Sequence, residues 1–172
     1  MRRRMAAILA AGALLSCAAA WAARSADWRQ ATDAELRTVI PARAPVVQER
    51  IETEMSSASG ITNGHGQYIA GVVLITAGYS AEGKYSHFFL TQVPLKLGGS
   101  LQLAPGQYVL GYERNDGGLL IHFYEAATGT PVGSVQATMT QDTRVVEFRV
   151  WPPAEHAEIQ IGRFSFSYRI GG

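Results

Sequence analysis

The chain has 172 residues, of which 47% are hydrophobic and 17% are charged, with a single Cys and a formal net charge of +1. This composition excludes an intrinsically disordered chain, a disulfide-stapled miniprotein and a collagen-like repeat. It fits one globular domain that buries its own core without a metal or a disulfide.

Residues 1–22 have the pattern of an export signal. Arg2, Arg3 and Arg4 precede an apolar stretch at residues 5–15, and Ala20-Trp21-Ala22 provides the cleavage site. The apolar stretch is shorter than the roughly 20 residues that a bilayer span needs. We therefore expect a protein of the periplasm or the extracellular medium, with no transmembrane span after the signal is cleaved.

A second cleavage site is an alternative. Leu14-Leu15-Ser16-Cys17 resembles the lipobox at which bacterial lipoproteins are cut and acylated, which would anchor the protein to the envelope through Cys17. Cleavage after Ala22 would instead remove the only Cys, and with it thiol catalysis, disulfides and thiolate metal sites.

The charge of the mature chain argues against nucleic-acid partners. The signal holds three Arg and no acid, so Lys+Arg falls from 15 to 12 against 14 Asp+Glu, and the net charge becomes −2. No run of Lys or Arg remains, and such a run is the usual electrostatic footprint of a nucleic-acid or anionic-membrane binder.

Residues 23–60 are expected to form a helical N-terminal segment. Thr32 and Glu35 have the spacing of a capping box, which predicts a short helix that ends at Pro41.

A second helix is expected from Pro45 towards Gly60. Val47, Ile51 and Met55 are four residues apart and would share one helical face. We interpret this helix as a cover for one end of a sheet, with binding of a partner as the alternative.

Residues 61–172 are predicted to form an antiparallel β domain. The hydrophobic period changes to two after Gly60, and turn residues recur about every ten positions, which indicates a sandwich or a barrel-like sheet of about seven strands. The clearest hairpin spans residues 107–125 and turns at 115–118. The other expected strands lie within residues 67–78, 85–93, 95–97, 101–103, 131–140, 146–150 and 159–170.

The last expected strand contains a change of phase. Ile159 and Ile161 are apolar at odd positions, whereas the apolar residues from Phe164 onwards lie at even positions. A β-bulge at Gly162-Arg163 would keep both halves facing the core.

The four His have no metal-ligand spacing, so no metal or other cofactor is expected. His65 lies between two glycines in a loop that a ligand can approach, and His156 lies in a surface loop. His87 and His122 lie in expected strands beside aromatic residues, where a structural role is the default. Convergence of such a His with a carboxylate in one pocket would instead indicate a metal- or His-dependent hydrolase.

Two common catalytic motifs are missing from the sequence. There is no Gly-x-Ser-x-Gly elbow, because Gly78-Tyr79-Ser80 lacks the second Gly. Gly98-Gly99 and Gly117-Gly118 are typical of hairpin turns rather than of a phosphate-binding loop.

Aromatic residues supply the best candidate for a binding surface. Tyr79 and Tyr85 flank the turn at residues 80–84, and together with His87 they form the expected ligand patch, to which His65 is added as a loop candidate.

The stretches at residues 70–80 and 83–87, and the run from Leu103-Ala104-Pro105-Gly106-Gln107-Tyr108 to Gly129, resemble a family of exported bacterial β-domain proteins with a domain of unknown function. The similarity covers most of residues 27–170. The resemblance implies export and a β-rich fold, and it supplies no catalytic residue.

The sequence therefore predicts an exported, non-catalytic binding or interaction domain. Its partner would be a small molecule, a glycan or an envelope protein. The alternatives are a lipid-anchored structural envelope protein acylated at Cys17 and the hydrolase described above.

Overall fold

The computed structural model describes residues 27–171, so the expected export signal, its expected cleavage site and Cys17 lie outside the described residues. The elements in chain order are β1 (Arg29–Gln30), α2 (Asp33–Val39), β2 (Arg43–Val46), β3 (Glu49–Thr62), β4 (Tyr68–Leu74), β5 (His87–Thr91), β6 (Leu95–Leu97), β7 (Leu101–Leu103), β8 (Gly106–Asn115), β9 (Gly118–Glu125), β10 (Pro131–Met139), β11 (Val146–Val150), β12 (Glu158–Gly162) and β13 (Phe164–Ile170).

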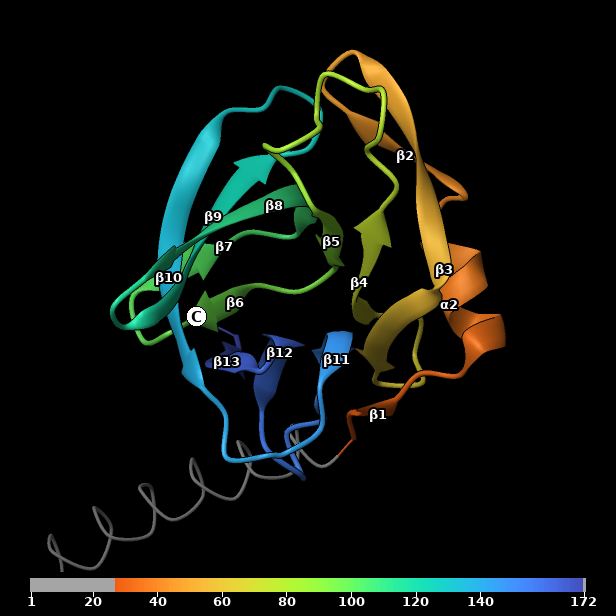
Figure 1. The fold of residues 1–172 in the computed structure, drawn as a ribbon. Coiled ribbons are helices and arrows are strands. Elements are labelled where there is room, and N and C mark those ends of the chain that lie inside the picture. The colour runs from red at the N-terminus through yellow and green to blue at the C-terminus, as the bar shows by residue number, and fades with distance from the viewer. Residues whose placement is uncertain (1–26, 172) are drawn as a thin grey trace, which may run out of the picture.

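The strands form one nearly closed antiparallel barrel. Within the described residues the sheet has 13 strands, in the order β1-β3-β4-β5-β8-β9-β10-β13-β12-β11, with β2 paired to β3 and the β6–β7 hairpin paired to β13. Figure 1 shows β3 and β4 on one side of the barrel and β9 and β10 on the other. The predicted mainly β, barrel-like class is confirmed, with more and shorter strands than expected.

Side chains rather than a full ladder hold the seam where β11 meets β3 and β4. The register of β3 shifts between Glu54 and Ser59. Beyond this irregularity, the Ser59 hydroxyl accepts a hydrogen bond from the backbone N–H of Val150 at 3.0 Å. Phe148 fills the space over Gly71, where an added Cβ would lie 2.6 Å from the Phe148 ring. Gly71 thus permits the close approach that closes the barrel.

Two hydrophobic clusters lie on opposite faces of the strands around β5. Inside the barrel, Phe89 and Phe123 meet edge to face, with ring centroids 6.1 Å apart, and Phe123 contacts Phe166 in the same way at 6.2 Å. Outside it, Phe88 packs with residues of α2 and β2, among them Leu36, in a second cluster that we call the outer cluster. Strand β5 is therefore buried on both faces.

The first helix forms as predicted. Thr32 caps α2 by accepting a hydrogen bond from the Glu35 N–H, while the Glu35 side chain accepts one from the Thr32 N–H, which confirms the capping box.

The second predicted helix is wrong. Residues 43–46 and 49–62 form the β2–β3 hairpin, and β3 continues through Gly60, so that residue marks no change of element. The reason is geometric, since residues four apart share a face in a strand as well as in a helix.

The predicted β-bulge at Gly162-Arg163 is also wrong. These two residues are the turn of a hairpin, in which Ile161 pairs with Phe164. Gly162 takes a φ of 62°, which suits a two-residue turn. A two-residue turn moves the apolar face from odd to even positions just as a bulge does.

The segment Leu103–Tyr108, which carries part of the family resemblance, forms a hydrogen-bonded corner. The Tyr108 hydroxyl donates a hydrogen bond to the Ala104 carbonyl at 2.7 Å, across the Pro105-Gly106 corner that leads into β8. Burial raises the pKa of Tyr108, so this hydroxyl stays protonated.

Candidate functional site

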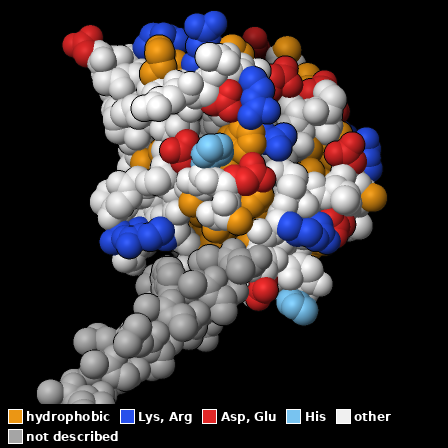
Figure 2. Space-filling view, turned by 90° about the horizontal axis from the view of Figure 1, so that it is seen from below, with side chains coloured by type: hydrophobic (Ala, Val, Ile, Leu, Met, Phe, Trp, Pro, Cys, Tyr) orange, Lys and Arg blue, Asp and Glu red, His pale blue; other side chains and the backbone are white. Residues whose placement is uncertain are grey.

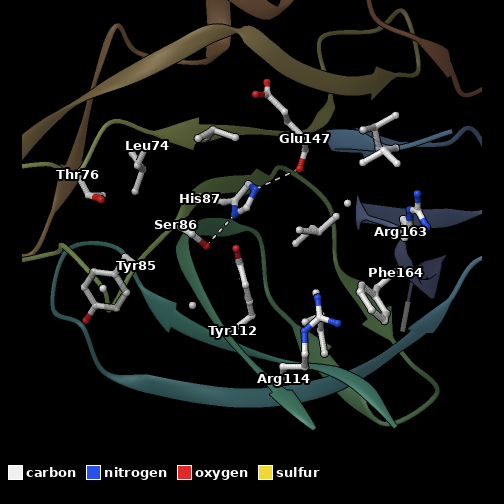
Figure 3. A pocket seen from close by; sticks show the side chains of 18 of the residues that line it. Leu74, Thr76, Tyr85, Ser86, His87, Tyr112, Arg114, Glu147, Arg163 and Phe164 are labelled. Atoms are coloured by element: carbon white, nitrogen blue, oxygen red, sulfur yellow. Dashed lines mark hydrogen bonds between the residues drawn. The ribbon is translucent and has the colours of Figure 1, made fainter. Parts of the chain in front are cut away.

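A cavity of about 1010 Å³ opens into the barrel beside the seam. Its walls come from β4, β5, from β8 to β11 and from the β12–β13 hairpin, together with the loops that join β4 to β5 and β10 to β11. Figure 3 shows these segments surrounding the cavity, with side chains from several of them directed inwards.

His87 forms the polar part of the cavity wall. It has the same inward orientation as Phe89 in β5, and only 4% of its surface is exposed. Its Nε2 lies 3.4 Å from the Glu147 carbonyl oxygen and its Nδ1 lies 2.8 Å from the Ser86 Oγ. Because a carbonyl only accepts, we assign the proton to Nε2, and Nδ1 then accepts from the Ser86 hydroxyl.

The environment keeps the His87 ring neutral. Burial lowers the pKa of His87 from 6.5 to about 4, because the charged ring would lose its hydration, and the bond to the Glu147 carbonyl offsets this only in part. A base this weak is poorly suited to take a proton from a serine near neutral pH. The Ser86–His87 pair is thus better suited to hydrogen bonding than to nucleophilic catalysis.

The cavity mouth is rimmed by exposed apolar side chains. Tyr112, Met139 and Val145 line it, with 49%, 65% and 61% of their surface exposed. Figure 3 shows Tyr112 extending toward His87, and the two ring centroids are 6.4 Å apart. Large hydrophobic side chains gathered around an opening are typical of an interaction site.

The inner wall of the cavity is apolar. Leu119, Ile161 and Phe164 line it and belong to the cluster inside the barrel. The cavity is therefore continuous with the barrel core.

Basic groups accompany the apolar rim. Arg114 and Arg163 line the cavity, and the Arg114 guanidinium lies 5.3 Å from the centroid of the Phe164 ring. Over the wider surface, Figure 2 shows acidic and basic side chains interspersed on one face, with hydrophobic side chains between them.

The structure brings two of the four predicted site residues to the cavity. His87 and Tyr85 line it, but the Tyr85 ring packs edge to face on Tyr124, with centroids 5.2 Å apart, as part of the outer cluster. Tyr79 lies elsewhere, where its hydroxyl donates to the Glu52 carboxylate at 2.5 Å. His65 lies exposed in the turn between β3 and β4.

Sequence reasoning missed most of the rim. Arg114, Met139, Val145 and Arg163 were not singled out, because charged and apolar residues at strand ends are common. Tyr112 was not among the predicted site residues either, because aromatic residues at alternating strand positions usually fill a core. Its exposure shows that the barrel is open at this point.

A separate serine, histidine and glutamate cluster lies on the outer face of β8, β9 and β10. The His122 Nδ1 is 2.7 Å from the Ser134 Oγ, and its Nε2 is 3.2 Å from the Glu113 carboxylate. The cluster does not line the cavity, and the nearby N–H groups of β9 are in ladders on both sides. The His122 ring is therefore held between Ser134 and Glu113 on the outer face of the sheet rather than in the cavity.

Residues 27–171 contain no group of three or more His, Cys, Asp or Glu placed to hold a metal ion. No helix in that part of the chain has the length and apolar character to cross a bilayer. No family model, curated protein or solved structure matches the chain.

Proposed function

We propose that the protein is an exported, non-catalytic binding protein that holds a small, partly apolar molecule in the cavity beside the barrel seam. The observation that carries this proposal is the cavity of about 1010 Å³, which lies within the size range of small-molecule sites. Its apolar wall and rim supply contact area for such a molecule.

The lack of activated groups at the cavity supports binding rather than catalysis. The His87 ring is a weak base with a pKa of about 4, and its two nitrogens are already engaged by Ser86 and Glu147.

The binding proposal is tested with phenylnaphthylamine, a neutral fluorophore that brightens in apolar sites. The protein is purified from cells that express the full chain. We expect saturable fluorescence with wild type, and a dissociation constant about fivefold higher for Val145→Asp, because a charged rim disfavours apolar contact.

The matched control is Val47→Asp, which places the same charge on another exposed valine outside the cavity lining. It should bind like wild type. Absence of saturable binding by wild type, or equal weakening by both variants, would overturn the proposed function.

Export is tested on the same material by intact-mass measurement. A mass that begins at Ala23 supports the soluble exported form. A lipid-modified chain that begins at Cys17 supports the anchored form, and an uncleaved chain would contradict export.

A further inference from the structure

The cavity carries two guanidinium groups that have no acidic partner in residues 27–171. Arg114 comes from the end of β8, and Arg163 comes from the turn between β12 and β13. Both are exposed and both line the cavity. The ion pairs in the described part of the chain all join other residues.

One of these groups, Arg114, stacks on an aromatic ring of the cavity wall, and the other directly precedes that ring residue in the sequence. The Arg114 guanidinium carbon lies 5.3 Å from the Phe164 centroid, and Arg163 directly precedes Phe164. Figure 3 shows Phe164 between the two arginine side chains in that view. Stacking on the ring restricts the Arg114 side chain, so less conformational entropy is lost when it binds a ligand.

No acid in the cavity lining neutralises this charge. The only acidic lining residue is Glu147, and Figure 3 shows its carboxylate directed away from His87 while its carbonyl faces the ring. Lys84 also lines the cavity, but its Nζ lies 4.9 Å from the Tyr85 ring centroid in the outer cluster. The charge presented at the cavity mouth is therefore positive.

The basic pair adjoins apolar surface on two sides. Phe164 and Ile161 continue from it into the barrel, and Met139 pairs with Phe164 across β10 and β13 at the rim. A ligand that satisfies both features has an anionic head and an apolar body. A metal cation is disfavoured by the arginines, and a simple inorganic anion would leave the apolar wall uncovered.

Resting on the proposed function, we infer that the ligand class is an amphipathic oxyanion. Its carboxylate, sulfonate or phosphate group is held by Arg114 and Arg163, and its apolar body lies against Phe164 and Tyr112. Planar guanidinium groups match these oxyanions through paired hydrogen bonds, which accounts for two arginines at one mouth.

The test compares two fluorophores that differ by one anionic group. Anilinonaphthalene sulfonate has the ring system of phenylnaphthylamine with a sulfonate added. Wild type should bind the sulfonate at least about tenfold more tightly than the neutral compound, which corresponds to one charge-assisted contact.

Arg114→Gln and Arg163→Gln should each abolish most of that preference, measured as the ratio of the two dissociation constants within the same variant. Arg169→Gln is the matched control, because it removes the same charge from an exposed position of β13 outside the cavity lining. It should keep the preference. Urea unfolding curves establish that each variant is folded.

Displacement of the bound sulfonate identifies which part of the ligand matters. Octanoate should compete more strongly than octanol or inorganic phosphate, each of which supplies only one of the two features. Equal competition by inorganic phosphate and octanoate would overturn the amphipathic assignment.

The two proposals fail in different ways. If the neutral compound shows no saturable binding to wild type, the proposed function fails. If the neutral compound binds at the cavity but the two arginine variants retain the wild-type preference for the sulfonate, the oxyanion inference alone is refuted.

Discussion

Lowering the pH should destabilise the protein through His87. Its pKa is about 4 in the folded state and 6.5 in an ordinary environment, so the unfolded chain takes up a proton between these values and the folded protein does not. Above pH 6.5 the ring is neutral in both states and has little effect on stability. Between pH 6.5 and about 4 stability is lost as the pH falls, and below that range the loss levels off.

The size of the effect follows from the surroundings of the ring. His87 is 4% exposed, and it faces the Tyr112 and Phe148 rings without a carboxylate at ion-pair distance in the described residues. The full difference corresponds to roughly 3 kcal/mol, because one pKa unit is about 1.4 kcal/mol. About 2 kcal/mol of this falls between pH 7 and pH 5.

Urea unfolding at these two pH values measures the effect. His87→Gln replaces the ring with an amide that does not titrate but can still donate to the Glu147 carbonyl and accept from Ser86. On going from pH 7 to pH 5, the free energy of unfolding of this variant should fall by about 2 kcal/mol less than that of wild type.

His65→Gln is the control, because His65 is exposed in a turn. It should follow the wild-type pH dependence. Equal pH dependence of wild type and His87→Gln would show that the ring is hydrated or already protonated in the folded protein, and the reasoning would be refuted.

Three further substitutions test the seam and the first helix by urea unfolding. Gly71→Ala should cost about 2 kcal/mol, since its Cβ would lie 2.6 Å from the Phe148 ring. Ser59→Ala should lower the free energy of unfolding by about 1 to 2 kcal/mol, because the buried Val150 N–H loses its acceptor. Hydrogen exchange at that amide should also accelerate. Thr32→Ala should cost about 1 kcal/mol through loss of the helix cap.

Matched controls separate the loss of these contacts from the general cost of a substitution to alanine. An added Cβ at Gly117 would meet nothing nearer than 3.4 Å, so Gly117→Ala should cost less than about 1 kcal/mol. Ser56→Ala, at an exposed position of β3, should likewise be nearly neutral. Unfolding losses for Gly71→Ala and Ser59→Ala no larger than those of the controls would contradict the assigned contacts at the seam.

The local features of the sequence predicted local structure well. The capping box at Thr32 and Glu35 starts α2, and the 107–125 hairpin turns where expected, with Asn115 paired to Gly118. Both features need only a few neighbouring residues to be satisfied. In the expected strand at residues 146–150, Phe148 and Val150 are buried, whereas Glu147 is exposed.

Patterns with two geometric solutions could not be resolved in the same way. The four-residue spacing of Ile51 and Met55 fits a strand and a helix equally, and only pairing with β2 and β4 selects the strand. Val47, expected on the same face, lies in the turn between β2 and β3. The change of phase at Gly162 fits a bulge and a hairpin turn equally. Pairing of β13 with β10 and β12 selects the turn.

The sequence by itself determined the β-rich class, the first helix and the strand faces, because composition, capping and alternation act over short distances. The tertiary structure decided where the barrel stays open. Tyr112 follows the alternation of β8 as a core residue would, yet nearly half its surface is exposed because the cavity opens beside it. Arg114 and Arg163 are far apart in the chain, and only the sheet order brings both to one cavity, with Arg114 over the Phe164 ring.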